Sequence, residues 1–305
     1  SRGASYELTI AEIKQKNSKA QLVMLSAVVK NPEKIAKWAM GDSNSYVSDS
    51  DIPKTEKSLG IMNPNRTKLN FWNLEEIFES SEFFVPLKPK VQTLPLFGRE
   101  TKERKFPDLD IKKSDPESRS RASRDLALYI AERVISAAPI AIFIPQAQSI
   151  SVYYKRLRDL NNRGCELPHL ASSCVSDEGQ RISKLFDMHY GKGEGGYLFH
   201  DGILMGVLPH YHDLQGCLRQ VVEDELASGN FKCVMCTSTL AQGVNLPIKY
   251  LVITGVRNGL AETKTRDFQN LLGRVARSGK FSEGSVLISD PLIFDSFGRR
   301  DYSRL

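Results

Sequence analysis

The sequence has 305 residues, of which 41% are hydrophobic and 26% are charged. Both fractions are typical of globular proteins and the length suits about two domains, so the composition excludes a disordered or collagen-like chain. No stretch approaches the ~20 consecutive apolar residues of a membrane helix. No apolar signal core follows the first residues, and we therefore expect no secretion. The net charge of +6 permits a nucleic-acid partner without requiring one.

The cysteines indicate a reducing compartment. Their number, five, is odd in a long chain, so we expect an intracellular protein, either cytoplasmic or in the nucleoid. Cys233 and Cys236 have the spacing of a redox motif, but they lie in an apolar run that reads as a strand, where residues three apart face opposite sides. No second C-x-x-C completes a zinc site. We interpret the pair as buried strand cysteines and expect no metal site.

The first part of the chain predicts two helices and a short strand. The helices span residues 1–16 and 31–41, and the strand spans residues 22–25. In the second helix, Asn31 is the expected N-cap, Ile35 and Trp38 face inward, and Gly41 ends the helix. Residues 46–65 are polar and rich in Ser, Asp, Pro and Asn, which is typical of an interdomain linker.

A basic stretch covers residues 88–124. It holds 11 basic and six acidic residues, a net charge of +5 that nearly equals that of the whole chain. Two interpretations stay open: a solvated basic loop, or a segment that contacts phosphates.

From residue 123 onward, apolar strands alternate with amphipathic helices. The expected helices span residues 123–137, 146–162, 177–189, 209–228 and 265–278. The expected strands span residues 140–144, 197–199, 231–236, 250–254 and 285–289. This alternation predicts an α/β fold with a parallel sheet that helices cover on both faces. In such sheets ligands bind at the carboxyl ends of the strands.

One unusual segment is the loop 237–247, which directly follows a predicted strand. Thr237 and Ser238 begin a run of three hydroxyl residues that can hold phosphate oxygens. Gly243 permits close approach of the backbone, and Asn245 offers a side-chain amide. The alternative is an ordinary Ser/Thr-rich turn.

The other unusual segment is the predicted helix near residue 270. Asn270, Arg274 and Arg277 are each about one turn apart, and Gly273 leaves the helix thin beside them. This arrangement suits a pair of guanidinium forks that bind phosphate. The alternative is a solvated arginine face.

These two segments resemble motifs V and VI of superfamily 2 helicases, especially the DExH-box group. Residues 237–247 read T-S-T-L-A-Q-G-V-N-L-P, which is similar to that group's T-S-T-L-A-x-G-V-N-L-P. Residues 270–277 resemble Q-x-x-G-R-x-G-R, with Asn270 at the glutamine position and Ala276 at the second glycine. Residues 25–28 resemble motif III, L-S-A-T, and residues 199–202 resemble the F-H-H-A/G segment between motifs IV and V. Asp201 departs from the second histidine there.

The resemblance implies a domain plan and an activity. Residues 1–45 would end a first RecA-like domain, residues 46–65 would link it, and residues 66–305 would form a second RecA-like domain with the basic insertion. The activity implied is that of an ATP-dependent helicase on single-stranded or duplex DNA or RNA, with DNA slightly favoured. ATP and Mg²⁺ are held in this family mainly by a first-domain P-loop and D-E-x-H box. This sequence has neither, so we expect the latter part of a larger motor that is inactive alone and requires the N-terminal motor half or a partner ATPase.

The resemblance also assigns roles to single residues. Arg274 and Arg277 would be catalytic, and Ser26 would couple the domains. The expected nucleotide contacts are Gly243, Asn245, Asn270 and Gly273. The expected nucleic-acid contacts are Thr237, Ser238, His200 and Gly202.

Two rival functions remain open. The chain could be a non-catalytic module that binds nucleic acid or docks on a separate ATPase, which the missing P-loop favours if this sequence is the whole gene product. A pure binding module, however, has little need for Gly273, Arg274 and Arg277 together. A small-molecule α/β enzyme is the other rival, but no G-x-G-x-x-G motif or nucleophile elbow supports it. His210 and His212 do not indicate a metal site, because residues two apart near a helix start do not share a face.

Overall fold

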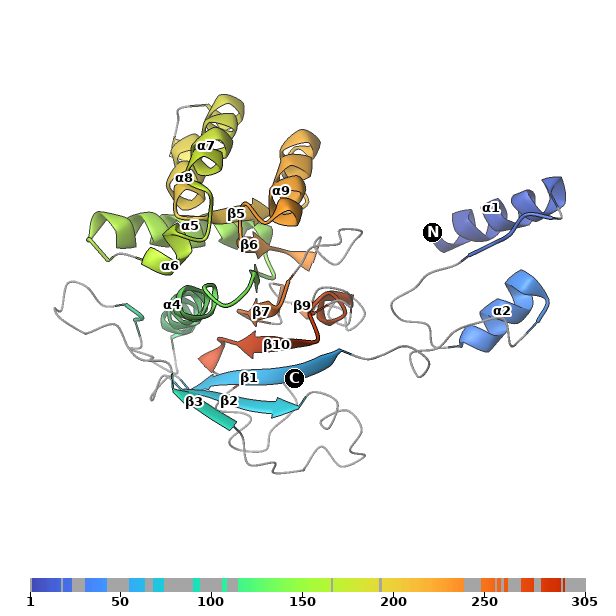
Figure 1. Cartoon of the computed structure of the whole chain (residues 1–305), viewed down its shortest axis with the longest axis horizontal. Helices are drawn as coiled ribbons and strands as arrows, with labels where there is room; N and C mark the ends of the chain where they lie inside the picture. The colour runs from blue at the N-terminus through green and yellow to red at the C-terminus, as the bar shows by residue number, and fades with distance from the viewer. Residues whose placement is uncertain are drawn as a thin grey trace. The chain divides into compact units, whose positions relative to one another are not determined.

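The computed structural model divides the chain into two compact units, Ser1–Lys54 and Thr55–Leu305 (Figure 1). The residues that the structure describes are 2–17, 19–23, 31–42, 55–63, 68–73, 90–93, 106–108, 115–165, 167–191, 194–238, 248–255, 257–258, 261–262, 270–276, 281–291 and 293. None of the helices in these ranges is both long enough and apolar enough to span a bilayer.

The first unit contains the two predicted helices, α1 (Arg2–Lys16) and α2 (Pro32–Met40). Helix α2 ends as predicted at Gly41, whose φ of +81° lies in the left-handed region that glycine adopts without strain. The expectation that Ile35 and Trp38 face inward was wrong, because they are 41% and 50% exposed. The residues that α2 buries are Ala36 and Ala39, which lie on the neighbouring stripe of the helix.

The strand expected at residues 22–25 is not observed at the two positions that can be described. Leu22 and Val23 have no regular structure, and Val23 is largely exposed. A strand needs a neighbour to pair its backbone groups, and the described residues of this unit include no other strand. Met24, Leu25 and the motif III residue Ser26 lie outside the described residues.

The second unit is built on an eight-stranded sheet in the order β3-β2-β1-β10-β7-β4-β6-β5. Its six parallel strands are β1 (Glu56–Asn63), β10 (Glu283–Ile288), β7 (Tyr250–Ile253), β4 (Ile140–Phe143), β6 (Cys233–Cys236) and β5 (Val207–His210). Strands β2 (Lys68–Asn73) and β3 (Lys90–Thr93) extend the β1 edge in antiparallel fashion. A separate small hairpin joins β8 (Arg257–Asn258) to β9 (Ala261–Glu262). The predicted parallel sheet is therefore confirmed.

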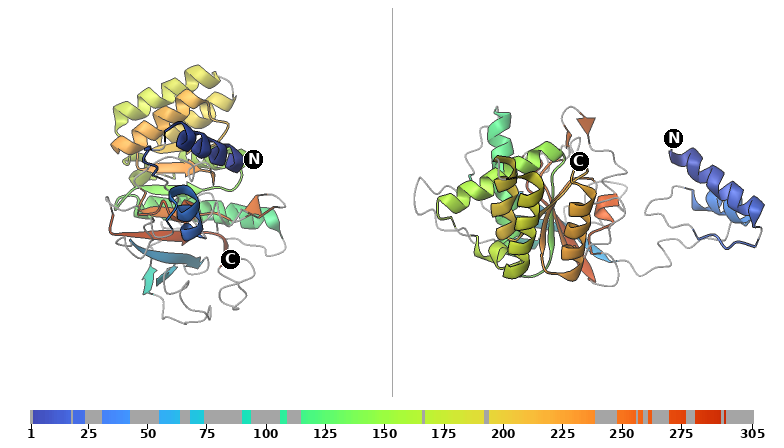
Figure 2. Two further views of the ribbon diagram at one scale, coloured as in Figure 1. Left: turned by 90° about the vertical axis from the view of Figure 1, so that its right-hand side faces the viewer. Right: turned by 90° about the horizontal axis from the view of Figure 1, so that it is seen from above.

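Helices cover both faces of this sheet, as predicted. They are α4 (Pro116–Val134), α5 (Ala147–Asn162), α6 (Pro168–Ala171), α7 (Ser176–Tyr190), α8 (Glu194–Leu204) and α9 (Gly216–Ser228). Figure 2 shows α5, α7 and α8 on one side of the sheet and α9 on the other. The central strands β4 and β6 are fully buried between these layers, which explains their continuous apolar sequences.

Two boundaries differ from the sequence-based expectation around α8 and β5. Residues 197–199, expected as a strand, belong to α8, where Phe199 packs edge-on against Tyr154 of α5 with ring centroids 5.0 Å apart. The helix expected from residue 209 begins at Gly216, because Pro209 and His210 complete β5. Pro209 is tolerated there because β5 is the edge strand of the sheet.

The polar segment 46–65 is only partly a connection. Residues 56–63 form β1, with Leu59, Ile61 and Met62 buried and the hydroxyl of Ser58 2.8 Å from that of Ser285 on β10. The interpretation of 56–63 as linker was therefore wrong, because polar residues on both sides hid the short buried run 59–62. The end of the basic stretch is also helical, since α4 begins at Pro116 rather than residue 123, capped by the Asp115 carboxylate.

Candidate functional site

Thr237 and Ser238 lie at the carboxyl edge of the sheet, directly after β6. Thr237 is 6% exposed, and its backbone N–H donates a 3.2 Å hydrogen bond to the backbone oxygen of His210 on β5. Ser238 is half-buried. The rest of the predicted loop, including Gly243 and Asn245, lies outside the described residues.

Other hydroxyl groups cap neighbouring strands at the same edge. The Thr254 hydroxyl donates to the backbone oxygen of Phe143 at 3.0 Å. The Ser289 hydroxyl donates to the backbone oxygen of Ile253 at 3.3 Å. From helix α4, the Ser123 hydroxyl donates to the backbone oxygen of Thr254 at 2.7 Å. These bonds hold the ends of β4, β7 and β10 in a fixed arrangement at the level of Thr237.

The structure does not place His200 and Gly202 at a strand end. Both lie in α8, where Nδ1 of His200 is 2.7 Å from a carboxylate oxygen of Asp187 on α7. Gly202 lies against the ring of Tyr154. The expectation that His200 lies at the end of a strand 197–199 was therefore wrong, because the aromatic packing of α8 makes this segment helical.

His210 ends the strand next to Thr237, a position that the sequence analysis did not assign. It is 1% exposed, and its Nε2 atom is 2.9 Å from a carboxylate oxygen of Glu223 on α9. A histidine that ends the apolar run V-L-P-H before polar residues was the available signal. The helix expected from residue 209 onward obscured this signal, because it included His210.

The second predicted segment differs from expectation in its local structure. Residues 270–272 are helical, but Gly273 and Arg274 form a turn, in which the N–H of Arg274 donates to the backbone oxygen of Leu271 at 3.0 Å. Asn270 and Arg274 are half-buried and Gly273 is exposed. The prediction that the helix continues to residue 278 was therefore wrong after Leu272, and Arg274 lies in a turn rather than one helical turn beyond Asn270.

Packing on β7 and β10 explains why the helix ends there. Val275 pairs with Ile248 in a parallel bridge, and Ala276, with φ of +50°, donates its N–H to the Ile248 oxygen at 2.8 Å. Both side chains lie on Gly284, where a Cβ atom would be 2.5 Å from the Ala276 Cβ and 2.7 Å from the Val275 Cγ1. Arg277 lies outside the described residues.

The two candidate segments lie at opposite ends of the parallel strands of one sheet, one at the carboxyl ends (the carboxyl edge) and the other at the amino ends (the amino edge). Thr237 is level with Thr254 at the carboxyl edge, since Cys236, Phe143 and Ile253 are in register across β6, β4 and β7. Val275 is level with Ile248, before the start of β7. At about 3.3 Å per strand residue, roughly 20 Å separates these levels along the strands.

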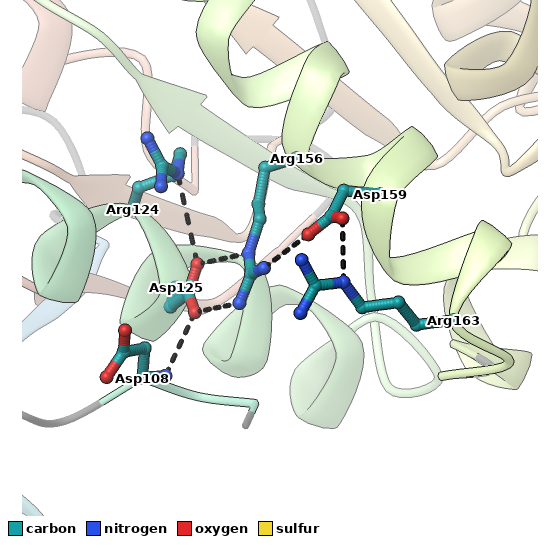
Figure 3. Close-up of polar contacts among 6 residues, drawn as sticks. All are labelled: Asp108, Arg124, Asp125, Arg156, Asp159 and Arg163. Atoms are coloured by element: carbon teal, nitrogen blue, oxygen red, sulfur yellow. Dashed lines mark hydrogen bonds and ion pairs between the residues drawn. The ribbon is translucent and has the colours of Figure 1, made fainter. Parts of the chain in front are cut away.

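A buried ionic cluster joins α4 to α5 near the carboxyl edge (Figure 3). Asp125, which is fully buried, accepts hydrogen bonds from Arg156 Nε at 2.9 Å and Nη2 at 2.6 Å, and from the backbone N–H of Asp108 at 2.9 Å. Arg156 also contacts Asp159 at 2.7 Å. Burial lowers the pKa of the adjacent Arg124. The cluster fixes the middle of α4, and with it the Ser123 hydroxyl, against the sheet.

No group of three or more His, Cys, Asp or Glu residues that could hold a metal ion occurs within the described ranges. Cys233 and Cys236 are buried in β6, and burial raises the pKa of both thiols. Buried protonated thiols on a central strand fit their interpretation as structural residues.

Comparison with known proteins relates the chain to helicases. No protein-family model matches it. It is 25% identical over 288 residues to the Hachiman protein HamB of Bacillus cereus, an alignment that covers 92% of this chain and 24% of HamB. It is 23% identical over 292 residues to the ATP-dependent DNA helicase Hel308 of Methanococcus vannielii, covering 94% of this chain and 32% of Hel308. It is 23% identical over 291 residues to the human helicase POLQ-like, covering 94% and 23%.

The chain thus spans about a quarter to a third of the length of these curated relatives. Each alignment nonetheless extends over nearly the whole of this chain, including both units of the structure. The chain is therefore helicase-like, and its second unit has the α/β RecA-like architecture that its sequence motifs predicted.

Proposed function

We propose that this chain supplies the second RecA-like domain of an ATP-dependent superfamily 2 helicase of the DExH-box group. The observation that carries the proposal is the placement of two segments on one sheet. Thr237 and Ser238 follow β6 at the carboxyl ends of the strands, and Gly273 and Arg274 form a turn near the amino ends of β7 and β10. One rigid unit can therefore contact nucleic acid at one edge and nucleotide at the other.

At the carboxyl edge, the proposed ligand is the sugar-phosphate backbone. Thr237 and Ser238 present hydroxyl groups that can donate hydrogen bonds to phosphate oxygens without reading the bases. Gly243 and Asn245, further along the same loop, remain proposed contacts of the nucleotide rather than of the nucleic acid. DNA is the favoured ligand because the related Hel308 is named as a DNA helicase.

At the amino edge, the proposed ligand is the γ-phosphate of ATP. Arg274 and Asn270 offer only hydrogen-bond donors and an amide, and Gly273 is exposed beside them. This set fits an anionic phosphate but does not fit Mg²⁺, which prefers carboxylate oxygens. ATP and Mg²⁺ would be held by a P-loop domain. The ATP would supply the phosphoryl group, and Mg²⁺ would neutralise part of its charge. The arginines of this chain would bind the γ-phosphate oxygens and stabilise their charge during transfer.

The carboxyl-edge contact is tested by nucleic-acid binding of the purified chain. Thr237→Val and Ser238→Ala are each expected to weaken the affinity for a fluorescein-labelled single strand by about tenfold, the effect of one lost hydrogen bond to a charged group. Ser172→Ala, at the exposed end of α6, is the control and leaves the affinity unchanged. If Thr237→Val and Ser238→Ala bound the strand as tightly as the Ser172→Ala control, the proposed contact would be contradicted.

A second candidate is a module that binds nucleic acid or docks on a separate ATPase without hydrolysing ATP itself. ATP hydrolysis separates the two. We expect the purified chain to hydrolyse no ATP, and the protein that includes a P-loop domain to hydrolyse ATP in a strand-stimulated reaction that depends on Arg274. Turnover that does not respond to Arg274→Ala would favour the binding module.

A further inference from the structure

We propose that His210 is a positioning residue for the nucleic-acid contact of Thr237. This inference rests on the proposed function, because it assumes that Thr237 binds the strand. It adds a residue on a neighbouring strand that sets where the Thr237 hydroxyl lies.

The backbone connection between the two residues is direct. His210 is the last residue of β5 and lies opposite Cys236 in the parallel register. Its backbone oxygen accepts the hydrogen bond from the N–H of Thr237, the first residue after β6. The orientation of the peptide group that begins the Thr237 loop is therefore set by the end of the edge strand.

The side chain of His210 fixes that strand end to a helix. The buried imidazole places Nε2 2.9 Å from the Glu223 carboxylate, whose side chain is 20% exposed on α9. Between them the chain makes a tight turn, in which the N–H of Leu214 donates to the backbone oxygen of Tyr211 at 3.2 Å. The sequence of contacts runs from α9 through Glu223 and His210 to Thr237.

Physical chemistry explains why a histidine, rather than an apolar residue, would fix the end of β5. Burying an imidazole costs free energy unless it is hydrogen-bonded, whereas an apolar side chain would fill the same place without that cost. An edge strand has a neighbour on one side only, so its end is less constrained than the ends of β4 or β7. The bond to Glu223 supplies the missing constraint at the residue that holds the Thr237 amide.

A double-mutant cycle on the purified chain tests the inference. The measured quantity is the affinity for a fluorescein-labelled single strand of about 20 deoxythymidines, by anisotropy. We expect Thr237→Val to weaken binding about tenfold and His210→Ala about fivefold. The double variant should bind no more weakly than Thr237→Val alone, because a misplaced hydroxyl matters only when the hydroxyl is present.

Further variants separate positioning from folding. His210→Gln keeps a donor near the Nε2 position and should restore binding to within about twofold, while His212→Ala, in the exposed loop, is the matched control. If His210→Ala does not fold by circular dichroism, Glu223→Ala breaks the same bond from the partly exposed side and replaces it in the cycle. Urea unfolding of each variant shows whether it is fully folded under the binding conditions, so that a loss of affinity is not mistaken for a loss of structure.

Independent losses of affinity that multiply in the double variant would overturn the role of His210 while leaving the Thr237 contact intact. A Thr237→Val variant that binds as the wild type would refute the contact itself and the inference with it.

Discussion

Gly202 packs directly on the ring of Tyr154, so closely that a Cβ atom at residue 202 would lie 2.2 Å from both Cδ1 and Cε1 of the ring. Tyr154 cannot easily move, because it is fully buried and its hydroxyl donates a 2.9 Å hydrogen bond to the backbone oxygen of Val207. This contact lets α8 lie close against α5. The structure therefore shows a packing role for Gly202, and its nucleic-acid contact stays a prediction from the sequence.

Gly202→Ala is expected to destabilise the protein by about 1–3 kcal/mol, since the added methyl group must displace a buried ring. Inside a helix, alanine is otherwise more stable than glycine by up to about 1 kcal/mol. A loss of stability in Gly202→Ala would therefore indicate the clash with Tyr154, because helix propensity alone would give a gain. Urea unfolding followed by circular dichroism measures it. Gly216→Ala at the start of α9, where nothing lies within 4 Å, is the control and should be neutral or stabilising. Equal stabilities for the two variants would contradict the close packing.

Asp125→Ala is expected to cost about 3–5 kcal/mol of folding stability, because it leaves the Arg156 guanidinium without its bidentate partner at a mostly buried position. Asp159→Ala removes the other carboxylate that contacts Arg156, but its side chain is 36% exposed, so its loss should cost less than about 1 kcal/mol. Both unfolding free energies are measured in urea at one pH. A much larger loss for Asp125→Ala than for Asp159→Ala would show that the buried ion pair, rather than the exposed one, stabilises the fold.

The five cysteines are expected to react with iodoacetamide at very different rates in the native protein. Cys217 is exposed and should be alkylated first. Burial raises the pKa of Cys233 and Cys236, so they hold fewer thiolates at pH 8 and are also shielded from the reagent. Mass spectrometry of timed samples should show these two modified only in denaturant. Rapid native modification of Cys233 would contradict a buried β6.

The sequence predicted elements well where one pattern decided the structure and poorly where packing decided it. Strands such as β4 and β6 are buried on both faces, so their apolar runs could be recognised directly. The helix before Arg274 could not be ended from sequence, because what ends it is the bridge of Val275 to Ile248, far away in the chain. His210 was missed for a similar reason, since its neighbours Thr237 and Glu223 meet it only through the fold.

The basic stretch 88–124 is expected to attract nucleic acid without sequence preference. Lys102, Arg104 and Lys105 lie in it, outside the described residues. Replacing all three by glutamine should weaken binding equally for different strands and reduce the slope of log affinity against log salt by at most about 3. Anisotropy titrations between low and moderate salt measure the slope. An unchanged slope would leave these charges as part of a solvated loop.

Variants of Arg274 and Arg277 test the proposed contact with the γ-phosphate of ATP. In a protein that includes the P-loop domain, Arg277→Ala and Arg274→Ala are each expected to reduce strand-stimulated ATP turnover by about 10³-fold, as loss of an arginine finger does. Nucleotide affinity should change much less, because the guanidinium acts on charge that develops during transfer. Lysine at either position should restore little activity, since a point charge does not replace a planar fork.

The matched control is Arg163→Ala, which removes a 53% exposed arginine at the C-terminal end of α5 that pairs with Asp159. It should leave turnover within about twofold of the wild type, as expected for an exposed ion pair. Steady-state turnover gives kcat, and binding of a non-hydrolysable ATP analogue gives affinity, so the two effects are measured separately. If alanine at both Arg274 and Arg277 left turnover at the level of Arg163→Ala, these arginines would be surface charges. The amino edge of the sheet would then have no nucleotide role.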